Sequence, residues 1–181
     1  YIPVKKHDHV LIPAGTVHCS GAGTMVLEIS ATPYIFTFKL WDWGRLDLDG
    51  KPRPIHLDHG MKNIQWNRNT EWVNEQLVGR VTTVYEGEEG CVERTGLHER
   101  EFIDTFRFDT ASKMKVQRND SVHVLNLVDG ERARIVSADG RFEPMTLHYA
   151  ETCIVPNDAG EYWIESDGEP IKVILACVRN G

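Results

Sequence analysis

The stretch HVLIPAGTVHCSGAGTMVLEIS, residues 9–30, decides how this chain folds. Two apolar runs, 10–13 and 25–29, enclose a segment that holds several glycines and His18. Short apolar runs bounded by Gly and Pro are typical of buried β-strands joined by a turn-rich corner. We therefore expect two strands with His18 at the bend, where a small β-barrel can present an imidazole to a metal. Glu28 lies on the second run and, since a carboxylate is rarely buried alone, we expect it to have a partner.

Three segments of the sequence together resemble one known family. They are IPAGTVH (12–18), GAGTMVLEIS (21–30) and FKLWDWGRLDLDGKPRPIH (38–56). In this combination they resemble the C-terminal half of the type I mannose-6-phosphate isomerases, the bacterial zinc-dependent cupins. The resemblance is strong over about residues 4–59 and continues, more weakly, through the C-terminal region.

The resemblance implies an all-β fold of the cupin, or jelly-roll, class, as part of a double-cupin architecture with one short helical segment. Residues 1–78 would form the C-terminal half of the catalytic, metal-binding barrel. Residues 79–181 would form a C-terminal jelly roll without metal. The helix-compatible stretch is 67–76, with Trp72 and Val73 as its apolar side.

Composition narrows the class of protein. The 181 residues carry a net charge of −7 and are 41% hydrophobic, which suits a folded protein, disfavours nucleic acid as a partner and leaves small polar substrates open. No apolar run approaches the roughly 18 residues of a membrane span. Four cysteines without a C-x-x-C pair indicate free thiols in a reducing compartment, so we expect a cytoplasmic location. The chain starts at Tyr1 in mid-pattern, and we expect a further segment upstream.

The stretch YIFTFKLWDW, residues 34–43, is rich in aromatic and β-branched residues and predicts a strand with both faces covered. Lys39 is its only cation, and it either reaches solvent at a barrel rim or serves a site. His56 and His59 follow in a segment that we expect to be a loop on the rim. The earlier triplet 7–9, His-Asp-His, is expected to be a surface turn and not a metal site.

From residue 78 onward, short strands alternate with turns, which is typical of a sandwich or jelly roll. The predicted strands are 102–108, 121–128, 133–136, 162–166 and 171–178. Two Asp-Gly pairs, at 129–130 and 139–140, predict tight turns on either side of the third strand.

A second corner, VPNDAGEY (155–162), follows an apolar run in this region. Laid against IPAGTVH, it has Glu161 where the first corner has His18, so we expect no metal here. His98, His123 and His148 stand far apart in sequence and are expected to be core or edge histidines, although a weak metal site among them is left open.

The activity implied by the resemblance is a zinc-dependent aldose–ketose isomerisation that interconverts mannose 6-phosphate and fructose 6-phosphate. The family takes its ligands from a Gln-x-His motif and a Glu in the first half of its barrel, and a His from the PAG corner. Only the last has a counterpart here, His18, so we expect one zinc per full-length chain and an incomplete, inactive site in these residues alone.

Two basic residues are the candidate catalytic groups. Alignment back from Trp41-Asp42-Trp43 puts Lys39 where the family has a catalytic Arg. Arg45 matches the Arg of the family's DWGR segment, and it is either a substrate contact or a structural partner of Asp42 or Asp47. A sugar phosphate and an upstream segment of the same enzyme are the expected partners, without nucleic acid or membrane, and homo-oligomerisation is left open.

A second function class remains on the sequence alone. Because a fold does not assign chemistry, the chain could instead be a non-catalytic cupin module that binds a sugar or regulates a partner. The coding sequence upstream of Tyr1 distinguishes the two, because the enzyme requires the remaining ligands there.

Overall fold

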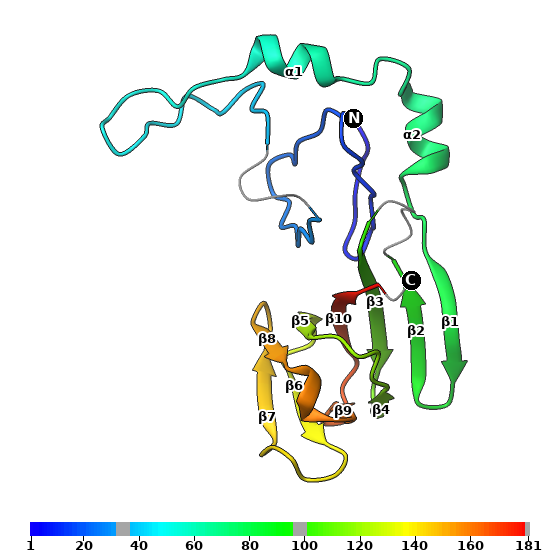
Figure 1. Cartoon of the computed structure of the whole chain (residues 1–181). Helices are drawn as coiled ribbons and strands as arrows, with labels where there is room; N and C mark the ends of the chain where they lie inside the picture. The colour runs from blue at the N-terminus through cyan, green and yellow to red at the C-terminus, as the bar shows by residue number, and fades with distance from the viewer. Residues whose placement is uncertain (32–36, 96–100, 180–181) are drawn as a thin grey trace. The chain divides into compact units, whose positions relative to one another are not determined.

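A computed structural model describes residues 1–31, 37–95 and 101–179 of the chain (Figure 1). These residues divide into two compact units. The sheet unit consists of Tyr1–His9 and Gly79–Gly181, and the corner unit is Val10–Val78. The chain therefore starts in the sheet unit, leaves it after His9 and returns to it at Gly79.

Antiparallel strands build the sheet unit (Figure 1). Among its described residues, one sheet has six strands in the order β1-β2-β3-β10-β5-β8, and the other has four in the order β4-β9-β6-β7. The bounds are β1 Thr82–Gly87, β2 Gly90–Arg94, β3 Ile103–Thr110, β4 Lys113–Val116, β5 His123–Asp129, β6 Arg132–Ser137, β7 Met145–His148, β8 Thr152–Val155, β9 Tyr162–Glu165 and β10 Ile171–Val178. All five strands predicted after residue 100 are confirmed, with ends that differ by at most two residues.

The core lies between the inner faces of the two sheets. Strand β5 shows how the sequence produces it, because His123, Leu125 and Leu127 are buried while the alternate residues are not. This period of two follows from side chains that point to opposite faces of a strand. Ile135 and Ile164 from the other sheet are fully buried in the same cluster.

The two Asp-Gly turns have different consequences. The second lies in a β6–β7 hairpin, since Arg132 pairs with His148 and Ile135 with Met145. After the first, the chain changes sheets, because β5 pairs with β10 and β8 whereas β6 pairs with β7 and β9. Gly130 has φ +87°, and a Cβ there would lie 2.6 Å from a methyl carbon of Ile171, so only glycine fits this crossing.

The corner unit contains two seven-residue helices, α1 Leu57–Asn63 and α2 Thr70–Gln76. Helix α2 confirms the predicted helical stretch, and the side chain of Asn69 caps it by accepting from the Trp72 amide at 2.9 Å. Helix α1 replaces the loop expected around His56 and His59. Within the described ranges, no helix has the length and apolar character that a membrane crossing requires.

The strands expected at 10–13 and 25–29 do not form. In the described part of the corner unit, β-pairing is limited to two isolated bridges, Val10 with Val78 and Leu46 with Pro52. Met25, Val26 and Leu27 are 73%, 62% and 47% exposed. β-Propensity yields a strand only where a neighbouring strand satisfies its N–H and C=O groups, and these described residues supply none.

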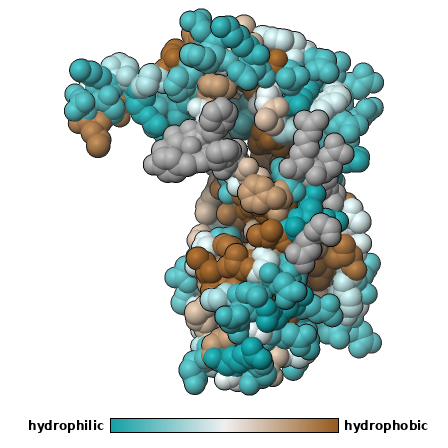
Figure 2. All heavy atoms as spheres, in the orientation of Figure 1, coloured by the Kyte–Doolittle hydropathy of each residue, from teal (hydrophilic) through white to brown (hydrophobic). Residues whose placement is uncertain are grey.

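Two further expectations for the corner unit are wrong in the same way. Residues 37–43 form no strand, and residues 34–36 of the predicted strand lie outside the described residues. Glu28 is exposed and needs no buried partner. Apolar residues are visible on the surface of the molecule in the space-filling view (Figure 2).

Candidate functional site

The Pro-Ala-Gly corner is a tight backbone turn that packs against the end of α1. Gly15 has φ +82°, and its carbonyl oxygen accepts from the amide of Gln65 at 2.9 Å. A Cβ at Gly15 would lie 2.7 Å from the carbonyl oxygen of Asn63 and 2.8 Å from Cγ of Gln65. Both the backbone conformation and the close approach therefore require glycine at this position.

Arg68, in the segment between the two helices, also binds the corner. Its Nη1 donates to the carbonyl oxygens of Pro13 at 3.1 Å and Ala14 at 2.7 Å, and to Oγ1 of Thr16 at 2.5 Å. The guanidinium lies 5.0 Å from the ring centroid of Trp72 on α2, a cation–π contact that orients it. The sequence analysis missed Arg68, because a lone Arg ahead of a helix carries no motif.

His18 lies two residues beyond this clamped corner and is exposed. Its Nδ1 lies 2.9 Å from the carbonyl oxygen of Thr16. A carbonyl can only accept, so Nδ1 carries the proton and Nε2 presents a lone pair. This tautomer, fixed by a backbone carbonyl, is the one that metal-binding or proton-accepting imidazoles commonly use.

The metal expected at His18 can be tested against the donors around it. Among the described residues, no group of three or more His, Cys, Asp or Glu side chains is placed to hold a metal ion. Since a catalytic zinc site takes about three protein ligands, the donors in the described part of the chain do not fit zinc.

Lys39 is half-buried and is tied through its backbone to the start of α1. Its amide donates to Nδ1 of His56 at 3.1 Å, and its carbonyl oxygen accepts from the His56 amide at 2.7 Å. The neighbouring Phe38 ring stacks on His59 with centroids 6.2 Å apart and meets His56 edge-on at 6.3 Å. The two histidines therefore anchor the 38–39 segment.

Arg45 is exposed. The side chains of Asp42 and Asp47, the two possible structural partners of Arg45, bind other groups. Asp42 is buried and pairs with Arg53, whose Nε lies 3.1 Å from Oδ2. Oδ1 of Asp47 accepts from the amides of Asp49 and Lys51, each at 2.9 Å. Across the described ranges, no hydrogen bond or ion pair joins His18, Lys39 and Arg45, so their common site stays a prediction.

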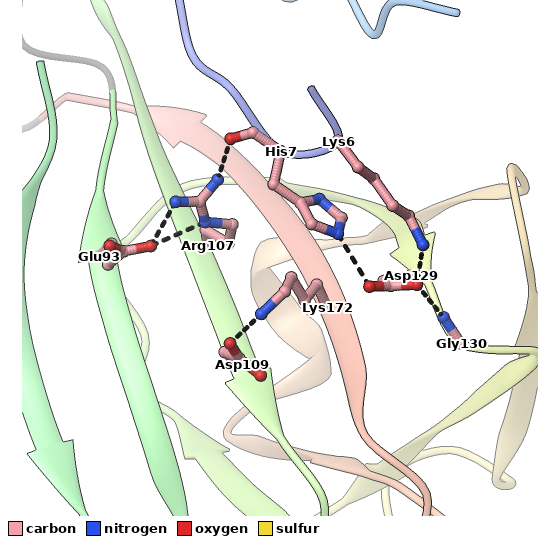
Figure 3. A network of polar contacts seen from close by, with 8 residues as sticks. All are labelled: Lys6, His7, Glu93, Arg107, Asp109, Asp129, Gly130 and Lys172. Atoms are coloured by element: carbon pink, nitrogen blue, oxygen red, sulfur yellow. Dashed lines mark hydrogen bonds and ion pairs between the residues drawn. The ribbon is translucent and has the colours of Figure 1, made fainter. Parts of the chain in front are cut away.

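The sheet unit carries a polar network on the outer face of its larger sheet (Figure 3). A turn forms close to the predicted one but two residues earlier, over residues 5–8, where the amide of Asp8 donates to the carbonyl oxygen of Lys5 at 3.1 Å, and it is held on this face. Lys6 and His7 both reach Asp129 at the end of β5, with His7 Nε2 2.8 Å from Oδ2. The hydrogen bond from Lys6, followed by those from His7 and the Gly130 amide, lowers the pKa of Asp129 to about 2 against the opposing effect of burial.

The same turn is held from a second strand (Figure 3). Arg107 on β3 donates from Nη1 to the carbonyl oxygen of His7 at 2.8 Å and pairs with Glu93 on β2 at 2.5 Å. Burial, and then the charge of Arg107, lowers the pKa of the neighbouring His9. The contacts of Asp129 and Arg107 with Lys6 and His7 thus fasten the N-terminal segment to the sheet.

His123 is a buried histidine of the sheet unit. Its Nδ1 lies 2.8 Å from the hydroxyl of Tyr162, and its Nε2 lies 2.8 Å from Oδ1 of Asn119. Burial, and then the charge of Arg118, lowers its pKa. His148 lies exposed beside Glu151, so these two histidines are core and edge residues as predicted, whereas His98 lies outside the described residues.

Comparison with known proteins confirms the resemblance inferred from the sequence. No protein-family model matches the chain. The mannose-6-phosphate isomerase of Streptococcus mutans is 24% identical over 174 residues, which cover 94% of this chain and 49% of that protein. The mannose-6-phosphate isomerase ManA of Bacillus subtilis is 22% identical over 170 residues, covering 94% and 50%. This chain therefore spans about half the length of these curated relatives.

A solved structure supports the fold. The crystal structure of the mannose 6-phosphate isomerase from Bacillus subtilis superimposes with a TM-score of 0.57 at 13% sequence identity, over 77% of this chain and 39% of that one. The all-β cupin jelly-roll class predicted from the sequence is thereby confirmed.

Proposed function

We propose that this chain is the C-terminal part of an enzyme that interconverts mannose 6-phosphate and fructose 6-phosphate. This proposal rests on two relatives named mannose-6-phosphate isomerase, whose matches cover 94% of the chain at 24% and 22% identity. The clamped corner supports it, because the contacts of Gly15 and Arg68 hold the backbone from which His18 presents Nε2.

The metal of the proposed enzyme is zinc, with His18 as one ligand. The described residues offer no second and third ligand beside it, so the others would come from the part of the relatives that this chain does not cover.

Lys39 and Arg45 are the proposed catalytic cations. The isomerisation moves a proton between C1 and C2 of the sugar, and negative charge develops on the oxygens of the intermediate. A fixed cation stabilises that charge in the transition state. Lys39 would supply such a charge without the bidentate fork of an Arg. Arg45 is exposed, and the side chains of Asp42 and Asp47 bind elsewhere, which favours a substrate contact.

The exposed apolar residues of the corner unit favour a further segment that packs against them. Met25 and Val26 are 73% and 62% exposed, and Trp41 and Leu48 are 65% and 107% exposed. Apolar surface of this kind usually marks an interface. We propose that the preceding part of the same enzyme covers it. The four cysteines are free, which suits a reducing cytoplasm as its location.

Expression of the complete coding sequence tests the proposal. We expect isomerase activity on mannose 6-phosphate that is lost in His18→Ala and kept in Cys19→Ser, the matched control at the exposed neighbouring position. A complete protein that lacks isomerase activity would overturn the proposal. If it still bound the sugar saturably, the non-catalytic sugar-binding or regulatory module would take its place.

One observation favours that second function. The described residues combine a lone imidazole at His18 with a Lys where the family has a catalytic Arg. A binding module tolerates both changes, since it needs no transition-state stabilisation.

A further inference from the structure

The sheet unit has a depression of about 370 Å³ at its second corner. Its lining residues come from β4 and the loop after it, from the β6–β7 turn, and from the corner and β9: Lys115, Arg118, Ala138, Asp139, Arg141, Gly160, Glu161 and Trp163. The volume lies within the range of small-molecule sites. This corner, VPNDAGEY, is the segment that aligns with the corner bearing His18.

Three cations converge on the depression, in a chain whose net charge is −7. Lys115 pairs with Glu161 at 2.5 Å, and Arg118 reaches the side-chain oxygen of Asn157. Arg141 donates from Nε to Asp139 at 2.7 Å and from Nη1 to the carbonyl oxygen of Asp158 at 3.2 Å. These contacts occupy only part of each donor set, because a guanidinium has five N–H groups and an ammonium has three.

The backbone makes room for these groups. Gly160 has φ +78°, and a Cβ there would lie 3.3 Å from Cδ and Nε of Arg141. The glycine thus allows the guanidinium to lie directly against the corner.

The indole ring of Trp163 is the aromatic side chain among the residues that line the depression. It faces outward on β9, because its neighbours Tyr162 and Ile164 are buried in the core. The ammonium of Lys113 lies 4.9 Å from its ring centroid and holds the indole in place.

We propose that this depression binds a small phosphorylated sugar. Clustered Arg and Lys side chains recognise phosphate. The carboxylates of Asp139 and Glu161 can accept from sugar hydroxyls, and an indole offers the flat apolar surface against which a sugar ring packs. The proposal concerns a second site, separate from the corner bearing His18, and it does not depend on the isomerase assignment.

Calorimetric titration of the 181-residue chain tests the proposal, with mannose 6-phosphate, mannose and inorganic phosphate as separate probes. We expect saturable binding of mannose 6-phosphate, about tenfold weaker binding of phosphate, and no measurable binding of mannose. Arg141→Gln should weaken the binding of mannose 6-phosphate by about tenfold or more, the scale of one lost charged hydrogen bond.

Three controls make the test decisive. Arg134→Gln removes a cation on β6 that pairs with Glu165 and does not line the depression, and it should change the affinity by less than about twofold. Trp163→Leu should weaken the binding of mannose 6-phosphate more than the binding of inorganic phosphate. His18→Ala should leave both affinities unchanged. The proposal is wrong if no binding saturates below about 10 mM, if Arg141→Gln and Arg134→Gln act alike, or if binding is lost in His18→Ala.

Discussion

Asp129 is the residue on which the N-terminal turn depends. It receives Lys6 and His7 together, and folding lowers its pKa from 3.8 to about 2. A carboxyl group with a lowered pKa stabilises the fold above about pH 4, and this contribution is lost as the pH falls toward about 2. Asp129→Asn should therefore lower the free energy of unfolding by about 1 kcal/mol at neutral pH, a value reduced for solvent screening.

Urea unfolding of both proteins at about pH 7 and about pH 2.5 checks this. The difference between wild type and variant should shrink at the lower pH. Asp167→Asn breaks the exposed pair with Arg132 and serves as the control, with a cost below about 0.5 kcal/mol. An equal cost in both variants would show that the Lys6–His7 contacts add nothing.

His123 makes the stability of the sheet unit depend on pH in the neutral range. Oδ1 of Asn119 can only accept, so Nε2 of His123 carries the proton and Nδ1 accepts from the hydroxyl of Tyr162, whose pKa is raised by burial. Protonation of Nδ1 would end its role as acceptor in that bond and would place a positive charge in a buried site. Because the pKa of His123 is lowered in the folded protein, the stabilisation is present above the unfolded value of 6.5 and is lost as the pH falls below it.

We therefore expect the free energy of unfolding to decrease between about pH 7.5 and about pH 5.5. His123→Gln should flatten this dependence without abolishing it, since the pKa of His9 is also lowered. An unchanged slope, measured by urea unfolding across this range, would contradict the assignment.

Lys39 is, with Arg45, one of the two residues whose proposed role is catalytic. Lys39→Met in the complete enzyme should reduce turnover by about 10²-fold, the scale of one lost electrostatic stabiliser. Lys39→Arg should recover part of it. Lys62→Met, on the last turn of α1, is the control and should stay near wild type. Turnover of Lys39→Met within about twofold of wild type would leave Lys39 as a lysine at the barrel rim.

At the scale of elements, Arg68 joins the corner to the helices. Arg68→Met keeps the volume of the side chain but removes all three hydrogen bonds to residues 13–16. We expect a loss of about 2–3 kcal/mol in the stability of the corner unit, because these bonds involve a charged donor. Hydrogen exchange of the Thr16 and Gln65 amides should accelerate accordingly, whereas Lys62→Met should leave their exchange unchanged.

The elements also show where the sequence was informative. The strands of the sheet unit were predictable, because a period-two pattern such as that of β5 finds partners on both sides, β10 and β8. The runs at 10–13 and 25–29 are apolar apart from Glu28, a composition that also favours strands, but they meet no ladder partner in the described residues. Helix α1 was not predicted because its N-cap, His56, makes no side-chain capping bond and because Gly60, a poor helix former, lies in its middle.

The site was predictable to a similar extent. The corner glycine and His18 follow a local motif, and the structure explains both through φ at Gly15 and the bond to Thr16. Arg68 was not predictable, since its three acceptors lie 52 to 55 residues earlier in the chain and only the fold brings them near.

At the scale of the molecule, the corner unit behaves as an insertion. Leu11 donates to the carbonyl oxygen of Leu77 at 3.0 Å, and Gly79 donates to that of His9 at 2.9 Å. The ends of each unit are thus adjacent, which is the condition under which domain insertion is tolerated. A chain in which a short Gly-Ser turn joins His9 to Gly79 should fold as the sheet unit alone.

Amide NMR spectra of this shortened chain check the prediction. Signals from β3, β5 and β10 should keep their positions, and Asp129→Asn should cost as much stability as in the whole chain. Deletion of Tyr1–His9 from the shortened chain is the matched comparison, and it should remove the Asp129 effect. Loss of dispersed signals would instead show that the two units fold together.

The ion pair between Lys6 and Asp129 joins residues 123 positions apart in sequence, and this separation affects the order in which the protein folds during synthesis. Residues 1–9 leave the ribosome before β3 and β5 are synthesised, so the turn has no docking site while the corner unit emerges. Closing a loop of this length costs conformational entropy, but that cost increases only slowly as residues are added to the loop. The turn should therefore dock only after β3 and β5, the strands that hold it, have formed.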